Sequence, residues 1–431
     1  MNAKPIAQPR GSAPAFIWLA LLALSYFFAF YDRQVMPVLG ELVKREFALS
    51  DRQLSLLTGA SFVLLYGAAG IAAGWLVDRW SRRRIIVGAL LLSSLFTMTC
   101  GLAQSFLQLM LARAGVGIGQ ATTVPAALSA IADRYPPARR PLAAGIFYTG
   151  GMVGLLVCFL GGTWVAARYG WRAGFLVAGP PGVLAAAVTA VFFQEPAREV
   201  DGRGPSGPAA EGSSFAEVWR NRPLRWLLFA NALGTFANLG VLQWLPNFFI
   251  RSHHLSVQQV GLYFGPVFAS GMAAGLLAGG VLGNRVAAQS VRHLIRLCAV
   301  VMLAIVPLYI LVLWLPSLVG ALAATFVGTV LSVLYAPSVT AAWQTLCAPR
   351  ARGTTAGISS FANSLLGGAL CSYCVGFLSD LWAPSLGAES LRHALSACLV
   401  FCVVAAALFA YSLRLSTEPA SSSAGRYARA A

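Results

Sequence analysis

Long apolar segments separated by short polar loops make up nearly the whole hydropathy pattern of this 431-residue chain. Each segment is long enough to supply the ~20 residues that a helix needs to cross the hydrocarbon core of a bilayer. Glycine and proline within the segments are typical of packed membrane helices, because small residues let helix backbones approach one another. Continuous apolar segments of this length exclude an outer-membrane β-barrel, whose strands alternate apolar and polar residues. The pattern predicts an all-α membrane protein with twelve spans, at Phe16–Met36, Leu54–Val77, Ile85–Ala103, Phe106–Ala132, Leu142–Ala166, Ala173–Phe193, Leu224–Ile250, Val257–Leu282, Leu294–Leu313, Ser317–Leu346, Thr354–Leu378 and Leu391–Leu413.

Composition supports a membrane protein and bears on its orientation. Only 10% of the residues are charged and 58% are hydrophobic, whereas soluble domains carry about 25% charged residues. The net charge of +17 would suit a nucleic-acid-binding protein, but most of the lysines and arginines fall in loops on the side of the two termini. This is the positive-inside asymmetry, so we expect cytoplasmic termini and no nucleic acid partner. The excess of arginine over lysine favours a bacterial inner membrane.

One polar segment divides the chain into two halves. It is rich in glycine, proline and serine, which is typical of a flexible linker, and six predicted spans lie on each side of it. We therefore expect a cytoplasmic tail at 1–14, a six-helix bundle at 15–194, a cytoplasmic linker at 195–221, a second six-helix bundle at 222–414 and a tail at 415–431.

Short motifs recur in the two halves at the same offset. Gly74-Trp-Leu-Val-Asp78-Arg79 follows the second span, and Gly280-Val-Leu-Gly-Asn284-Arg285 follows the eighth. Leu-Ser with a glutamine three residues after the serine precedes both spans, at Leu49 and at Leu255. Two parallel six-helix repeats are the organisation of many transporters, in which the halves rock about a substrate near the bilayer midplane.

The charges inside the predicted spans mark a candidate site. Asp32 and Arg33 lie in the first span and Arg113 in the fourth. A carboxylate in hydrocarbon is costly, so it is kept where it has a partner, a water-filled cavity or a function. The antiparallel directions of the two spans bring Asp32 and Arg113 to similar depth, and Gln120 lies seven residues beyond Arg113 on nearly the same helix face.

These charges suggest a coupling mechanism. Protonation of Asp32 would weaken its ion pair with an arginine and free that arginine for an anionic headgroup. The alternative is a static buried ion pair that orders the N-terminal half.

The segment after the second span resembles the inner-loop signature of the major facilitator superfamily, G-x-x-x-D-R-x-G-R-R, with Ser81 in place of the usual glycine. The resemblance implies a twelve-helix fold in which this loop latches the cytoplasmic ends of the two halves, with Asp78 near an arginine or the N-terminus of the eleventh span. The alternative is a simple positive-inside anchor. The gating residues that we expect are Gly74, Asp78, Arg79, Arg82, Arg83, Arg140 and Arg352.

Within that superfamily the chain resembles the spinster-like transporters over about residues 25 to 415. The motifs that carry this resemblance are Tyr31-Asp32-Arg33, Arg113-Ala-Gly115-Val-Gly117-Ile-Gly119, Asp133-Arg134-Tyr-Pro136-Pro137-Ala-Arg139-Arg140, Tyr169-Gly-Trp171-Arg172, Trp244-Leu-Pro246, Phe249-Ile-Arg251-Ser-His253 and Gly376-Phe-Leu-Ser-Asp380.

The chain departs from its relatives at one position. Relatives commonly have a glutamate after the glycine run of the fourth span, and there that acid and the span-one aspartate are associated with proton coupling. This chain has Gln120, which cannot titrate. The resemblance thus implies coupling through Asp32 alone, or none, which would leave a uniporter or exchanger.

The resemblance also implies a substrate with a charged end and an apolar body, such as a lysolipid. The C-terminal half offers polar and aromatic groups but no charge within a span, and these groups could equally hold helices together. An organic anion symporter for sugar acids, or a multidrug efflux carrier, is the alternative. The substrate-binding residues that we expect are Arg33, Arg113, Gln120, Tyr31, Asn238, Trp244, Tyr335 and Asn363.

Other functional classes find little support in the sequence. No Ser/His/Asp set, phosphate loop or metal pattern survives the assignment of spans, so we expect no enzyme, cofactor or metal. The expected partners are a small-molecule substrate, membrane lipids and protons. Each chain should hold a complete pathway, so we expect a monomer.

Overall fold

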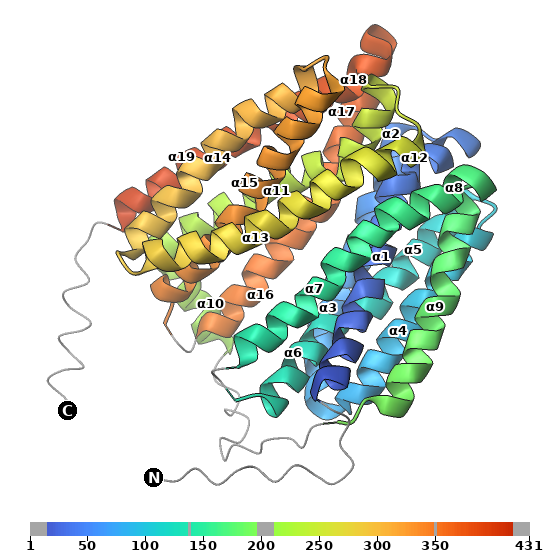
Figure 1. Ribbon diagram of the computed structural model, residues 1–431. Coiled ribbons are helices and arrows are strands. Elements are labelled where there is room, and N and C mark those ends of the chain that lie inside the picture. Colours follow the sequence, from blue (N-terminus) through green and yellow to red (C-terminus); the bar gives the residue numbers. More distant parts are fainter. Residues whose placement is uncertain (1–14, 137–138, 196–210, 349–350, 417–431) are drawn as a thin grey trace, which may run out of the picture. The chain divides into compact units, whose positions relative to one another are not determined.

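The structure, a computed structural model, describes residues 15–136, 139–195, 211–348 and 351–416. All regular elements in these ranges are helices (Figure 1). Ten helical segments there are long and apolar enough to cross a membrane, and one of them, Thr354–Leu415, contains two predicted spans. Helix α11 (Arg222–Ser252), the predicted seventh span, is long enough but is not among the ten. The predicted all-α membrane fold is confirmed.

The chain forms two compact units, and each includes a short segment from the other half of the sequence. Unit 1 consists of Met1–Leu49, Ser61–Gly202 and Ser256–Gly265, and unit 2 of Ser50–Ala60, Arg203–Leu255 and Pro266–Ala431. The predicted tail at 1–14, residues 196–210 of the predicted linker and residues 417–431 lie outside the described residues. The predicted division into two bundles at the linker stays a prediction.

Unit 1 contains the elements that position the candidate site. Serine hydroxyls accept a backbone N–H at the start of α4 and of α5, as N-caps do. Helix α1 packs on α7, and α4 packs on both α5 and α9. Helix α5 ends at Gln120, and α6 begins at Thr123, two residues before Pro125. The proline ring cannot continue a regular helix, which accounts for this short break. The elements are α1 (Ala15–Glu46), α3 (Ser61–Arg79), α4 (Arg82–Leu102), α5 (Phe106–Gln120), α6 (Thr123–Arg134), α7 (Arg140–Val157), the π-helical η2 (Cys158–Gly162), α8 (Thr163–Tyr169), α9 (Trp171–Phe192), α12 (Val257–Gln259) and the π-helical η3 (Val260–Phe264).

Unit 2 has the same kind of architecture. Helix α11 packs on α19 and on η5, and α14 packs on α15. Besides α11, its elements are α2 (Asp51–Ser55), the π-helical η1 (Leu56–Ala60), α10 (Glu211–Arg220), α13 (Gly265–Ala287), α14 (Val291–Trp314), α15 (Leu318–Leu346), α16 (Arg352–Ala362), the π-helical η5 (Asn363–Leu370), α17 (Cys371–Leu386), the short 3₁₀ helix η6 (Gly387–Glu389), α18 (Ser390–Cys398) and α19 (Val400–Leu415).

The end of the predicted linker forms helix α10 rather than extended chain. Phe215, Val218 and Trp219 recur at helical spacing, Val218 is fully buried, and the rings of Phe215 and Trp219 stack. This apolar stripe gives the segment a face to bury, which a flexible linker lacks.

The internal repeat that the sequence predicts reappears as matching local geometry. Ala48 and His254 both have positive φ angles, of 49° and 53°. Ser50 and Ser256 then open short helices through capping boxes with the glutamine three residues later. A π-helical turn follows each box, at η1 and at η3. Equivalent parts of the two halves therefore fold alike.

Candidate functional site

Asp32 is a deeply buried carboxylate in the middle of α1. Only 1% of the surface of Asp32 is exposed. The hydroxyls of Ser93 and Thr97 on α4 lie next to it, yet Oδ2 has no hydrogen-bond partner of good geometry among the described residues. A buried polar atom left without a partner is costly and calls for an explanation such as a function or an unseen ligand.

Arg113 lies beside Asp32 but bonds to its main chain. Nη1 donates to the carbonyl oxygen of Asp32 at 2.7 Å. The guanidinium is as deeply buried as the carboxylate, and Nε and Nη2 have no hydrogen-bond partner among the described residues. This hydrogen bond joins Arg113 to the backbone of Asp32 rather than to its carboxylate. Two donors therefore remain for another acceptor.

Arg33 is surrounded by aromatic rings. Its guanidinium carbon lies 5.2 Å from the centroid of Phe62 and 5.1 Å from that of Tyr66. The guanidinium carbon of Arg113 lies 5.5 Å from the same Phe62 ring. Distances below about 6 Å are those of cation–π contacts. The shared ring of Phe62 thus brings the two arginines into one site within unit 1.

The glycine run of α5 allows this arrangement. A methyl group on Gly117 would lie 2.5 Å from the carbonyl oxygen of Phe62, so α5 and α3 approach as closely as a bare backbone permits. A methyl group on Gly119 would likewise lie 2.8 Å from the backbone nitrogen of Ser93 on α4. The run therefore lets α5 hold Arg113 against Phe62 and Asp32.

Two other predicted residues lie in the same unit. Gln120 ends α5, is 2% exposed, and neither of its amide atoms has a hydrogen-bond partner among the described residues. Tyr31 is also buried, and its hydroxyl donates to the carbonyl of Gly174 at 3.5 Å. Gln120 thus has unused hydrogen-bonding capacity, whereas Tyr31 is directed to the backbone of α9.

Sequence reasoning missed the polar side of α4. Ser93, Ser94 and Thr97 are all buried, and the hydroxyls of Ser94 and Thr97 lack a hydrogen-bond partner among the described residues. Their spacing places them on one face of a helix. Three hydroxyls on one face of an apolar span could have been noticed in the sequence, but their proximity to Asp32 could not.

The candidate residues of unit 2 mostly form hydrogen bonds that link neighbouring helices. Asn238 on α11 donates to the carbonyl of Ser332 at 2.9 Å and accepts from Tyr309 at 3.5 Å. The hydroxyl of Tyr335 lies 3.4 Å from that of Thr235. These bonds join α11, α14 and α15.

Asn363 and Trp244, the other two candidate residues of unit 2, also form hydrogen bonds of this kind. Asn231 donates to the side-chain oxygen of Asn363 at 3.0 Å. The indole of Trp244 donates to the carbonyl of Ser372 at 3.3 Å. The structure thus gives each of these groups a role in helix packing, and their predicted role in substrate binding stays a prediction.

The predicted gating segment is tied into unit 1 by charge. Arg82 Nη2 lies 2.6 Å from the Asp133 carboxylate on α6, and its Nε donates to Ser129 at 3.1 Å. Glu195 accepts from the backbone N–H of Arg82 at 2.8 Å and from the hydroxyl of Ser81. This carboxylate sits at the positive N-terminus of α4, where an anion is favourable.

The other gating residues are less informative. Arg83 donates to the carbonyl of Ala190, and Arg140 Nε donates to that of Tyr135 at 2.9 Å. Arg79 ends α3 and Arg352 begins α16, and both are exposed. The surroundings of Gly74 and the side chain of Asp78 lie outside the described residues. The latch itself stays a prediction.

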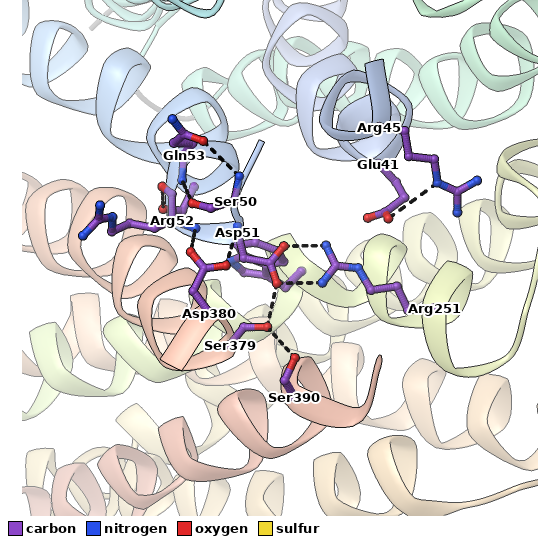
Figure 2. Close-up of polar contacts among 12 residues, drawn as sticks. Glu41, Arg45, Ser50, Asp51, Arg52, Gln53, Arg251, Ser379, Asp380 and Ser390 are labelled. Atoms are coloured by element: carbon purple, nitrogen blue, oxygen red, sulfur yellow. Dashed lines mark hydrogen bonds and ion pairs between the residues drawn. The ribbon is translucent and has the colours of Figure 1, made fainter. Parts of the chain in front are cut away.

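A second charged cluster lies in unit 2 around α2, and Figure 2 shows it. Both carboxylate oxygens of Asp51 accept from Arg251, each at 2.7 Å, and Oδ2 also accepts from Ser379 at 2.6 Å. Asp380 accepts from the backbone N–H groups of Asp51 and Arg52 at 2.7 and 2.8 Å. Two carboxylates therefore fasten the first turn of α2 to α11 and α17.

The described residues contain no group of three or more His, Cys, Asp or Glu side chains that could hold a metal ion. The chemistry of the site in unit 1 is therefore that of one carboxylate, two guanidinium groups, hydroxyls and an amide. Such a set can bind an anion and exchange a proton.

Known proteins with similar sequences and structures are membrane transporters. An MFS-type efflux pump of Mycolicibacterium smegmatis is 28% identical over 393 residues, covering 90% of this chain and 90% of the pump. A probable sulfoacetate transporter of Cupriavidus necator is 28% identical over 283 residues, covering 62% of this chain and 64% of that protein. An inward-facing, unoccupied crystal structure of a bacterial homologue of the human lysosomal transporter Spinster superposes with a TM-score of 0.82 at 28% identity, covering 94% of this chain and 98% of that one.

The sequence profile of the Major Facilitator Superfamily matches residues 22–372, which is most of the chain. The two-unit helical fold, the buried charges and this match agree. The chain is an integral membrane protein that belongs to the Major Facilitator Superfamily, whose members are secondary transporters of small molecules and not enzymes.

Proposed function

We propose that this transporter carries a small organic anion with an apolar body, such as a lysolipid, by alternating access, and that Asp32 couples transport to protons. The observation that carries the proposal is the position of Arg33 and Arg113 over one ring, that of Phe62, beside the buried Asp32. Two cations accompany one carboxylate there, so an anionic ligand would complete the charge balance.

The unused donors support an anionic headgroup. Arg113 Nε and Nη2 and Arg33 Nε are buried and have no hydrogen-bond partner among the described residues. Guanidinium groups bind carboxylate, sulfonate and phosphate oxygens through paired, charge-assisted hydrogen bonds. The aromatic rings of Phe30, Phe62 and Tyr66 around Arg33 would accept the apolar part of the ligand.

Coupling through Asp32 rests on its burial and on one carboxylate oxygen without a hydrogen-bond partner among the described residues. Its Oδ2 has no partner among the described residues, while Gln120, at the position where relatives commonly have an acid, cannot titrate. A buried carboxylate that meets water in one conformation and apolar surroundings in another takes up and releases a proton during the cycle.

A second candidate is a short, polar organic anion. The Cupriavidus necator relative is named as a probable sulfoacetate transporter, and sulfoacetate is a small dianion without an apolar body. The Mycolicibacterium smegmatis relative is named as an efflux pump, which would reverse the direction of net transport.

The proposed arrangement in the membrane follows the charge pattern. We propose that both termini are cytoplasmic, that the membrane is the inner membrane of a bacterium, and that one chain forms a complete pathway. The basic residues on the side of the termini and the bacterial relatives support this arrangement.

Transport by the purified protein in proteoliposomes tests the substrate and the coupling together. Radiolabelled lysophospholipids, sphingoid phosphates, sugar acids and sulfoacetate would be offered with and without an inward proton gradient. We expect lysolipid uptake that the gradient accelerates. Arg33→Gln should reduce affinity by about 10–100-fold, as expected for one lost hydrogen bond to a charged group, and Arg168→Gln, an exposed arginine beside Trp164, should not.

The Asp32→Asn variant separates coupling from transport. It should lose acceleration by the gradient but keep exchange of labelled for unlabelled substrate. Gradient-driven uptake at the normal rate in Asp32→Asn would disprove coupling through this residue. Uptake of sulfoacetate or sugar acids alone would favour the second candidate.

A further inference from the structure

Unit 1 has an apolar groove on its outer surface, formed by α3, α4 and α5. Its volume is about 500 Å³. Small residues hollow it out, since Ala69, Gly88, Ala89 and Gly119 line it, and a methyl group added to Gly88 would meet open space. Four of the larger apolar residues along it are 38–45% exposed: Leu91, Leu92, Leu95 and Ile118.

The groove is about as long as one leaflet of a bilayer is thick. Along α4 its lining runs from Arg84 to Leu95, which at about 1.5 Å per residue is about 16 Å. The hydrocarbon core of a bilayer is ~30 Å thick, so this length spans one leaflet from its surface to about the midplane. An acyl chain of a lipid has this reach and this chemistry.

One end of the groove is chemically different from the rest. Trp80, which is 57% exposed, and Arg84 stand there at the end of α3 and the start of α4. Tryptophan and arginine are the side chains that favour the headgroup region of a membrane. Arginines at a membrane surface attract anionic lipids.

The charge of Arg84 distinguishes this groove from a second groove of unit 1. It lies between α1 and α7, has a volume of about 400 Å³, and is lined by apolar residues and Thr149 without any charged side chain. Both grooves can take hydrocarbon, but only the first of these two offers a cation to a headgroup.

We propose that the groove between α3, α4 and α5 binds one acyl chain of an anionic phospholipid from the surrounding bilayer, with its phosphate at Arg84. This site is distinct from the Asp32–Arg33–Arg113 site, so the proposal does not depend on the identity of the transported substrate. With both termini in the cytoplasm, as proposed above, the bound lipid would lie in the cytoplasmic leaflet.

Native mass spectrometry of the purified protein, titrated with phosphatidylglycerol or phosphatidylcholine of equal chain length, tests the site. We expect one phosphatidylglycerol to be retained in preference to phosphatidylcholine. Gly88→Leu should abolish that bound lipid, because the Cβ of the new residue meets open space and the rest of the side chain would occupy the groove. Arg84→Gln should lower the preference for phosphatidylglycerol about five-fold, the effect of one basic side chain at a membrane surface.

Two control variants match these changes. Thr149→Leu fills the second groove and Arg168→Gln removes an exposed arginine elsewhere in unit 1, and both should bind phosphatidylglycerol as the parent protein does. Equal retention of phosphatidylglycerol by Gly88→Leu and the parent protein would overturn the proposal, as would an unchanged lipid preference in Arg84→Gln.

A second measurement avoids the substitution at Gly88. In vesicles with brominated phosphatidylglycerol, Trp80 fluorescence, obtained as the difference between the parent protein and Trp80→Phe, should be quenched more strongly than with brominated phosphatidylcholine. Equal quenching by the two lipids would mean that the groove takes bulk lipid only, and the proposal would be wrong.

Discussion

Arg113 holds the main chain of Asp32, with Nη1 donating to the carbonyl oxygen at 2.7 Å. A hydrogen bond to a backbone carbonyl does not depend on the charge of the neighbouring carboxylate. A proton can therefore reach Asp32 without breaking this contact between α1 and α5. The simple picture in which protonation releases Arg113 has to be modified, because the anchoring bond is made to the backbone and the free donors are Nε and Nη2.

The two arginines should consequently differ in their effect on stability. Arg113→Gln should destabilise the protein by about 1–3 kcal/mol, because it leaves a buried carbonyl of α1 without its donor. Arg33→Gln should have a smaller effect, since Arg33 is only partly buried and its guanidinium packs against aromatic rings. Thermal unfolding in detergent measures this difference, and equal melting temperatures for the two variants would contradict it. Both variants should bind the transported anion more weakly.

Gln120 offers a gain-of-function test of proton coupling. Its amide atoms are buried and have no partner among the described residues, so Gln120→Glu places a carboxyl of the same size there without breaking a hydrogen bond. A second titratable group should increase the number of protons moved for each substrate. The measurement is the reversal potential of transport at fixed proton and substrate gradients. An unchanged ratio of protons to substrate would show that Gln120 lies outside the coupling pathway.

Gly117 should be intolerant of any side chain. A methyl group there would lie 2.5 Å from the Phe62 carbonyl oxygen, so Gly117→Ala should force α3 and α5 apart and destabilise unit 1 by about 1–3 kcal/mol. Displacement of Phe62 should also weaken substrate binding. Gly67→Ala on α3 is the matched control, because a methyl group there meets open space. A melting temperature that falls equally in both variants would argue against the close contact.

Much of the fold could be predicted because periodicity and length are local properties. The long apolar segments gave the helices, and the repeat of Leu-Ser before the second and eighth spans corresponds to capping boxes at Ser50 and Ser256. Helix α10 was missed, since the glycine- and proline-rich residues before it dominated the composition of the segment. Its stripe of Phe215, Val218 and Trp219 carries the signal.

The candidate site was harder to predict, because it depends on which faces of separate helices meet. Asp32, Arg33 and Arg113 stand out by their charge in apolar spans. Their geometry does not follow from charge, since Phe62, whose ring contacts both arginines, is one apolar residue among many in its span. Hydrogen-bond partners within unit 2, such as Ser332 for Asn238, require the packed structure as well.

His253 predicts a pH dependence of stability that is separate from transport. It follows the last residue of α11, and its ring stacks on Phe249. Partial burial lowers the pKa of His253 below its usual value, and the charges of Arg392 and His254 act in the same direction. The folded state therefore resists a proton that the unfolded chain accepts near pH 6.5.

Stability should accordingly be unaffected by His253 above about pH 7 and should fall as the pH drops below about 6.5, by at most about 1.4 kcal/mol per pH unit. Melting temperatures between pH 7.5 and 5 should show a steeper decline for the parent protein than for His253→Gln. Arg392→Gln should reduce the decline in part, because one of the charges that lowers the His253 pKa is removed. Identical pH profiles for the parent protein and His253→Gln would refute this account.

Asp51 and Arg251 should form the most strongly coupled ion pair of those described above. Both carboxylate oxygens bond to the guanidinium at 2.7 Å, and both side chains are largely buried. Loss of one partner leaves an uncompensated charge, so Asp51→Asn or Arg251→Gln alone should cost about 3–5 kcal/mol. The double variant should be less destabilised than the sum of the two, with a coupling energy of about 1–3 kcal/mol in a double-mutant cycle. The pair Glu41 and Arg45 in α1 is the control, because these residues lie 3.8 Å apart along one helix and Arg45 is exposed. Their coupling should not exceed about 0.5 kcal/mol. Equal coupling energies in the two cycles would mean that burial adds nothing to the Asp51–Arg251 pair and that α2 is fastened to unit 2 by its other contacts.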